Sequence, residues 1–197
     1  MADPLQAIAY IKTRLLEKSY GSHVEAFGVS YSKTLQTQIK SKGILESFEL
    51  VSQLNGFNCL DAVLFSSHIL LTLYSKLIHN RHIIIFPISF STSTRNNKKY
   101  SHVILGCCIN LKFGALGLSR STLLTSKPFY QNSLSGIVTD YVKSFKVLHL
   151  QVKKIKIGSQ ITLDNLTCKL DWKKEVIYLN DNASSRLDFI GNQLIQK

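Results

Sequence analysis

Residues 83–118 read IIIFPISFSTSTRNNKKYSHVILGCCINLKFGALGL, and this stretch decides the fold class. Two apolar runs, at 83–92 and 100–110, flank the polar turn sequence RNNKK, and a third run follows at 113–118. Short runs rich in β-branched and aromatic residues, separated by polar turns, predict antiparallel strands joined by hairpins. Pro87 has no amide hydrogen to donate, which predicts an edge position or a bulge for the first strand.

Helical patterns lie on both sides of this hairpin. Upstream, apolar residues recur at helical spacing in 4–19 and 32–54, and a long apolar helix is expected from Cys59 to about His79. Downstream, the pattern predicts helices at 133–145 and 187–195 and strands at 147–157 and 176–179. We therefore predict an α+β fold in a single domain over 1–197, with a helical part at about 1–80, a β-rich part at about 81–180 and a terminal helix at about 184–197.

The composition is that of a folded and strongly basic chain. Of its 197 residues, 45% are hydrophobic and 18% are charged, which argues against disorder. The formal net charge of +12 favours acidic partners such as nucleic acid, anionic lipid or an acidic protein segment, without choosing among them. The apolar stretch 60–78 contains too many polar residues for a lone membrane span, so a buried core helix explains it better.

The four cysteines are spaced for neither a metal site nor a disulfide framework. Cys107 and Cys108 are adjacent, and no C-x-x-C pair occurs. The N-terminal residues carry charges throughout and lack the pattern of a signal peptide. These observations predict a reduced, cytoplasmic setting and neither a metal nor an organic cofactor.

Cys59 and His102 together predict a thiol nucleophile of the papain or transglutaminase type. Asn58 is a favoured N-cap, so Cys59 is expected at the first helical position, where the helix terminus favours the thiolate. Asp61 opposes this effect, and a structural cysteine at the start of a core helix is the open alternative. His102 is expected in a buried strand, where it is either the general base or a core histidine with a satisfied hydrogen bond.

Ser119 follows in the glycine-rich stretch FGALGLSR. Its hydroxyl can accept a hydrogen bond from the far ring nitrogen of His102 and so fix the tautomer, as an aspartate does in other triads. Taken on sequence alone, Ser119 is interpreted as a turn residue.

Four segments carry a resemblance to a known family: GFNCLDAVLF, FPISF, YSHVILG and FGALGLSR. As a set they resemble the vasohibins, cysteine carboxypeptidases that remove the C-terminal tyrosine of α-tubulin. The resemblance implies a transglutaminase-like cysteine protease fold and a Cys59–His102–Ser119 triad. It further implies that Arg120 holds the terminal carboxylate of the substrate and that Tyr20 lies near the scissile bond. The implied partners are α-tubulin tails and microtubules in the cytoplasm, with a small vasohibin-binding protein as a further, less supported partner.

The chain departs from the family pattern around this site. Asn58 stands where relatives carry a lysine, Ser101 stands in place of an arginine, and Ser121 replaces a second basic residue. These changes predict a pocket with less positive charge and an altered preference for the terminal residue. Lysines elsewhere are candidates to compensate: Lys33, Lys98, Lys99 and Lys112.

Three functions remain in competition at this stage. The first is the thiol carboxypeptidase, with Asn58 and Lys33 as further substrate-binding candidates. The second is a microtubule- or polyanion-binding module whose pocket has lost catalysis, and it predicts salt-sensitive binding that is indifferent to Cys59. The third is a thiol peptidase or transglutaminase with another protein substrate. A membrane is not expected as a partner. Nucleic acid is not expected either, because no aromatic-basic RNA-binding signature is present.

Overall fold

The structure is a computed structural model, and it describes residues 3–16, 19–20, 56–80, 82–162 and 175–196. Its centre is a six-stranded sheet in the order β6-β5-β4-β3-β7-β8, in which every neighbouring pair is antiparallel. The strands are β3 (Ile83–Ser93), β4 (Lys99–Ile109), β5 (Lys112–Leu116), β6 (Lys127–Gln131), β7 (Gln151–Ile157) and β8 (Glu175–Tyr178). This sheet and its helices make the fold α+β, as predicted.

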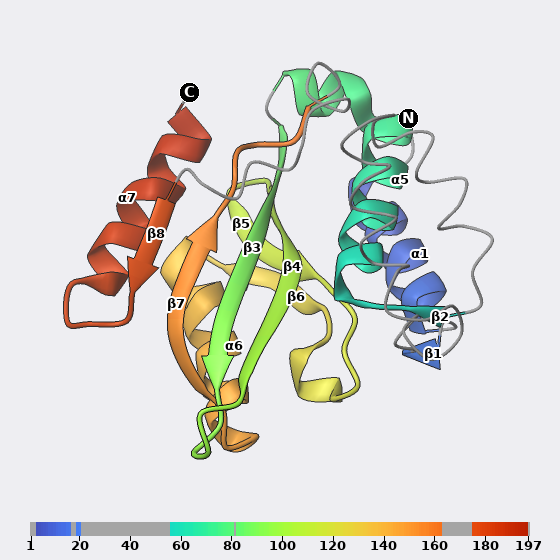
Figure 1. Cartoon of the computed structure of the whole chain (residues 1–197). Coiled ribbons are helices and arrows are strands. Elements are labelled where there is room, and N and C mark those ends of the chain that lie inside the picture. The colour runs from blue at the N-terminus through green and yellow to red at the C-terminus, as the bar shows by residue number, and fades with distance from the viewer. Residues whose placement is uncertain (1–2, 17–18, 21–55, 81, 163–174, 197) are drawn as a thin grey trace, which may run out of the picture.

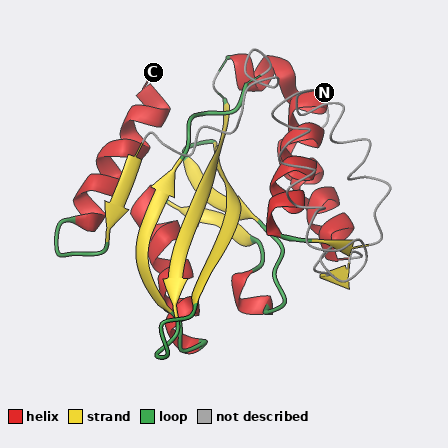
Figure 2. Cartoon of the chain, in the orientation of Figure 1, coloured by secondary structure: helices red, strands yellow, loops and turns green. Residues whose placement is uncertain are grey.

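Helices cover both faces of the sheet (Figure 1). One face packs against α1 (Pro4–Leu16) and α5 (Cys59–His79), and the other packs against α6 (Leu134–Val147) and α7 (Ala183–Gln196). Figure 2 shows the helices on either side of the strands, with the single turn η1 (Thr122–Leu124) in the loop after β5. A short parallel pair, β1 (Ser19–Tyr20) and β2 (Gly56–Phe57), leads into α5.

Side-chain alternation along β4 decides which residues meet which helices. Val103 and Leu105 belong to the core formed with α1 and α5, whereas Ile104 and Cys108 belong to the core formed with α6 and α7. Successive side chains of a strand point to opposite faces, so His102 shares its face with Ile104. The two cores explain why β4 reads as a nearly continuous apolar run.

The position of Pro87 was predicted wrongly. Strand β3 is an interior strand between β4 and β7, and its irregularity lies between Ser91 and Thr92. The pairing with β7 runs from Ile88 onward, and the carbonyl of Pro87 accepts from the backbone N–H of Gly158. Proline is tolerated here because its missing N–H faces the point where the β7 ladder ends.

The remaining elements follow the sequence with shifted ends. The strand expected from 147 begins at Gln151, because α6 continues to Val147, and the terminal helix begins earlier, at Ala183. Strand β6 and the turn η1 were not predicted. The helical pattern at 32–54 lies outside the described residues. No described helix is long and apolar enough to span a membrane, and the described side chains form no metal-binding group of His, Cys, Asp and Glu.

His149 ends α6 in an unusual way. Its backbone has φ 56°, and its N–H donates to the carbonyl of Lys146 while that of Leu150 donates to the carbonyl of Phe145. This is the Schellman pattern, in which glycine usually occupies the left-handed position. A histidine there carries the cost of its Cβ, which glycine would not.

We therefore expect His149→Gly to raise the free energy of unfolding by about 0.5–1 kcal/mol and His149→Val to lower it by at least about 1 kcal/mol. Urea unfolding of the three proteins measures both differences. Equal stability of the glycine and valine variants would contradict the role of the positive φ.

Candidate active site

A reciprocal pair of hydrogen bonds fixes the start of α5. The side-chain oxygen Oδ1 of Asn58 accepts from the backbone N–H groups of Leu60, at 2.8 Å, and Asp61, at 3.0 Å. In return, Asp61 Oδ2 accepts from the N–H of Asn58 at 2.8 Å. This is a capping box built from asparagine and aspartate. The prediction of Asn58 as N-cap and Cys59 as the first helical residue is confirmed.

The thiol of Cys59 lies against the backbone of β4. Backbone N–H groups of Val103, Cys59 and Leu60 interact with the sulfur and lower its pKa, but burial and the charge of Asp61 act more strongly in the opposite direction. The net pKa of Cys59 is therefore raised, and desolvation is the largest cause. The resting group is a thiol, so a base has to remove its proton before it can attack.

The amide of Val103 is available to the sulfur because β5 stops short of it. The pairing between β4 and β5 covers Leu105 to Ile109 on β4, and Val103 lies beyond its end. The two-residue hairpin at 110–111 makes Ile109 face β5, and strand alternation then turns the N–H of Val103 to the same side. Cys59 thus reaches the open edge of β4, one residue from His102.

His102 is buried, with 7% of its surface exposed, and it lies against Tyr141 and Phe145 of α6. Its Nε2 is 3.0 Å from the carbonyl oxygen of Leu124. A carbonyl can only accept, so Nε2 carries the hydrogen and Nδ1 of the neutral ring is the free acceptor. Burial lowers the pKa of His102 to about 4, and the carbonyl contact opposes that shift in part. The ring is therefore a neutral base at physiological pH.

Leu124, not Ser119, supplies the acceptor opposite His102, which corrects the contact expected from sequence. The Ser119 hydroxyl accepts from the N–H of Ser121 at 3.3 Å, and the Ser121 hydroxyl accepts from the N–H of Leu123 at 3.3 Å. The two serines thus stabilise the turn η1, whose last residue presents the carbonyl. A backbone acceptor has no sequence signature, and the role expected for Ser119 came from the family resemblance.

A second group of contacts holds η1 from the side of α6. Lys127 Nζ donates to the carbonyl of Leu123 at 2.9 Å and to the hydroxyl of Ser144 at 3.1 Å. The same ammonium group lies 5.3 Å from the centre of the Tyr141 ring, and Tyr141 donates to the carbonyl of Thr125 at 2.6 Å. These bonds fix the carbonyls on either side of Leu124. Sequence reasoning missed the roles of Lys127 and Tyr141, because both contacts depend on how α6 packs against the turn η1.

The remaining candidate residues from the sequence are Tyr20, Arg120 and Lys33. Tyr20 pairs through its backbone with Phe57, two residues before Cys59, but its side chain is outside the description. Arg120 is exposed in the loop next to Ser119, and it already takes part in an interaction within the protein. Lys33 lies outside the described residues.

Comparisons with known proteins identify the family. The family model described as Vasohibin matches residues 44–189. The chain belongs to the vasohibin family. A relative, tubulinyl-Tyr carboxypeptidase 1 from Mus musculus, is 34% identical over 93 residues. That alignment covers 47% of this chain and 24% of the relative, so the chain matches about a quarter of the relative's length. The vasohibin match contains Cys59, His102 and Arg120, whereas Tyr20 and Lys33 precede it.

Proposed function

We propose that this chain is a cysteine-type carboxypeptidase that removes the C-terminal residue, tyrosine, from the acidic tail of α-tubulin in the cytoplasm. The observation that carries the proposal is the placement of Cys59 at a capped helix start, against the amide next to His102. His102 in turn has its Nε2 hydrogen fixed by Leu124, which leaves Nδ1 to accept a proton. The family and the printed name of the relative support the reaction class and the substrate.

In the proposed reaction, Nδ1 of His102 takes the proton of Cys59, and the thiolate attacks the carbonyl carbon of the last peptide bond. The N–H groups of Cys59 and Val103, already directed at the sulfur, are candidates to stabilise the oxyanion, with Tyr20 as a further candidate. His102 then protonates the leaving amine, the thioester forms, and water hydrolyses it. The Leu124 carbonyl stabilises the imidazolium that forms in between, because the acceptor faces its Nε2 hydrogen.

Specificity in this proposal rests on charge. Arg120 would hold the terminal carboxylate, because a guanidinium can donate two parallel hydrogen bonds to it. Asn58 cannot supply a second positive charge, because its amide is neutral, and its Oδ1 is already engaged in the capping box. The net charge of +12 would still attract an acidic tail over a distance of about 8 Å at physiological salt.

The test is the mass of an α-tubulin tail peptide after incubation with the protein. Wild type is expected to remove one residue from a tail with a free carboxylate and none from the same peptide with a C-terminal amide. Cys59→Ala is expected to leave both unchanged. Cleavage of the amide, or internal cleavage, would instead indicate a thiol peptidase of another specificity. Salt-sensitive microtubule binding without any cleavage would favour the binding module.

Lys127 provides a further prediction for this reaction. Lys127→Met keeps the aliphatic stem but removes the bonds to Leu123 and Ser144, so the carbonyl facing His102 becomes less well positioned. We expect kcat to fall by roughly tenfold with KM unchanged, the loss of about 1.4 kcal/mol that one hydrogen bond to a charged group can account for. Lys143→Met, at an exposed position of α6, is the matched control. An unchanged kcat in Lys127→Met would remove this residue from the positioning network.

A further inference from the structure

A cavity of about 720 Å³ lies outside the site of Cys59. It is bounded by the end of β3 and the following turn, by the C-terminal half of α6, and by the start of β7. Its floor includes Val142 and Val152, which belong to the α6 side of the sheet, whereas α5 lies on the opposite side. The volume is within the range of small-molecule sites, about 300–1,000 Å³. None of its lining residues has a part in the proposed reaction.

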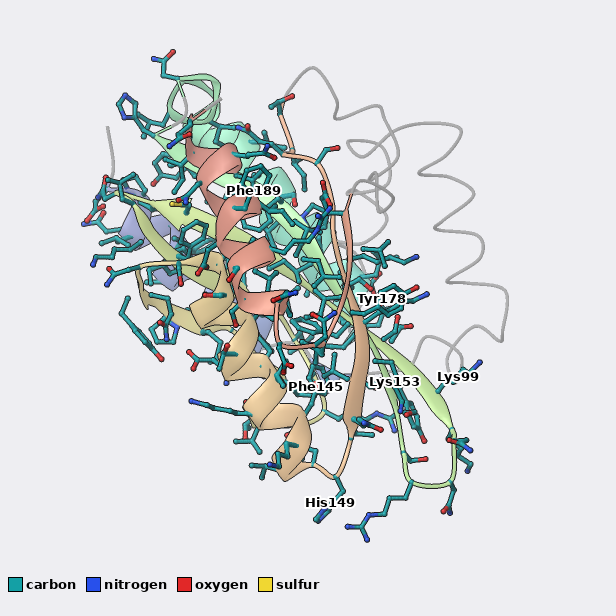
Figure 3. The ribbon with its side chains drawn as sticks, turned by 90° about the vertical axis from the view of Figure 1, so that its left-hand side faces the viewer. Lys99, Phe145, His149, Lys153, Tyr178 and Phe189 are labelled. Atoms are coloured by element: carbon teal, nitrogen blue, oxygen red, sulfur yellow. The ribbon has the colours of Figure 1, made fainter. Side chains whose placement is uncertain are left out.

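The cavity is basic, and its two cations and one histidine come from separate elements. Arg95 lies in the turn between β3 and β4, Lys146 in the last turn of α6, and His149 in the turn toward β7. Figure 3 shows His149 at the end of α6 where the chain turns into β7. The side chains of these three residues form no hydrogen bond or ion pair with any other described residue. No acidic side chain is among the described residues that line the cavity.

Two further features of the wall indicate a ligand. Ser93 lines the cavity and is 7% exposed, and its hydroxyl has no hydrogen-bond partner among the described residues. This hydroxyl is not among the fully buried atoms, so it can donate a hydrogen bond to a ligand oxygen. His149 adopts the left-handed conformation described above, at the position that glycine usually occupies. Retention of a strained histidine beside a cavity is typical of a functional position.

From this lining we infer that the cavity binds an organic phosphate monoester with a flat, apolar body. A phosphate carries a charge of about −1.5 to −2 and three strong acceptor oxygens, which suits two cations and an imidazole on separate elements better than a planar carboxylate does. The guanidinium of Arg95 can contact it through two hydrogen bonds, and the hydroxyl of Ser93 can donate a third. The apolar floor then accommodates the body of the ligand. A mononucleotide and a phosphorylated tyrosine side chain share this chemistry.

The experiment is calorimetric titration of the full chain with phenyl phosphate, inorganic phosphate and benzyl alcohol. We expect phenyl phosphate to bind at least tenfold more tightly than inorganic phosphate, and benzyl alcohol not to bind. AMP and N-acetyl-phosphotyrosine amide, titrated in parallel, then distinguish the two sources of the phosphate. Inorganic phosphate binding as tightly as phenyl phosphate, or no binding of any organic phosphate, would overturn the inference.

Variants connect the binding to the cavity. The double variant Arg95→Gln, Lys146→Gln is expected to weaken phenyl phosphate binding at least tenfold, and His149→Gly to weaken it severalfold without any loss of thermal stability. Lys143→Gln changes an exposed lysine of the same helix that does not line the cavity, and it should leave binding unchanged. An equal loss in Lys143→Gln and the double variant would show a non-specific attraction to the basic surface and would overturn the site. These exposed substitutions leave Cys59 and its surroundings intact, so the result is independent of the proposed peptidase activity.

Discussion

Cys59→Ala is expected to abolish cleavage of the α-tubulin tail, and His102→Ala to lower kcat by about 10²–10⁴-fold, the range of general-base catalysis. The reason is the protonation state of both groups in the free protein. Burial keeps Cys59 as a thiol and His102 neutral, so in the proposed reaction the imidazole has to take the proton of the thiol before it attacks. The measurement is the single-turnover rate of tyrosine release, with saturating enzyme, at neutral pH.

Ser119→Ala distinguishes this account from a simple three-residue triad. In the structure the Ser119 hydroxyl accepts from Ser121, and the carbonyl of Leu124 faces His102. Its removal should therefore loosen the turn without removing the acceptor, and we expect kcat to fall less than about tenfold, the equivalent of one neutral hydrogen bond. A loss in Ser119→Ala as large as that in His102→Ala would mean that the hydroxyl acts on the histidine directly.

The second large effect concerns stability in acid. The pKa of His102 is lowered to about 4 in the folded chain, from an ordinary value of 6.5, because the ring is buried. Between these two values the unfolded chain binds more protons than the folded chain, so the free energy of unfolding rises with pH and is lost as pH falls from 6.5 toward 4. The slope of 1.36 kcal/mol per pH unit gives a loss of about 2 kcal/mol from His102 alone between pH 6.5 and pH 5.

The comparison of wild type with His102→Gln isolates this contribution. Glutamine does not titrate, and its amide can still donate to the carbonyl of Leu124. We expect urea unfolding to show wild type losing about 2 kcal/mol more than His102→Gln when the pH is lowered from 7 to 5. His82→Gln, which changes an exposed histidine, is the control and should follow wild type. Parallel pH profiles for all three proteins would contradict a buried, neutral His102.

Much of the fold could be predicted from the sequence because its helices and strands are determined by short, local patterns. The hairpin from β3 to β4 follows from two apolar runs and a polar turn, and the start of α5 follows from Asn58. Pro87 led to the wrong prediction of an edge or a bulge. A missing N–H is tolerated at an edge, but it is also tolerated where the ladder to a neighbouring strand ends, as it does here. The end of α6 was placed too early because Val147 was assigned to the following strand, and no glycine marks the helix end, where His149 takes the left-handed position.

Sequence patterns proposed the reactive groups of the candidate site, but they could not predict the contacts that support them. Cys59 and His102 are residue types that perform this chemistry, so pattern and spacing could select them. The acceptor of His102 is the backbone of Leu124, and the order of its turn depends on Lys127 and Tyr141. Backbone atoms carry no residue-type signal, and contacts across the sheet depend on packing. The cavity beside His149 could not be predicted either, because Arg95, Lys146 and His149 come from three separate elements.

The pH dependence of Cys59 alkylation by iodoacetamide tests the pairing of Cys59 with His102 most directly. Because burial and Asp61 raise the pKa of the thiol above 9, we expect the rate in wild type to increase with pH through a midpoint above 9. Asp61→Asn should move that midpoint to lower pH, because it removes the opposing charge, and His102→Gln should slow the reaction at neutral pH. A plateau of full reactivity at neutral pH would reveal a preformed thiolate, and a wild-type profile identical to that of His102→Gln would contradict the catalytic pair.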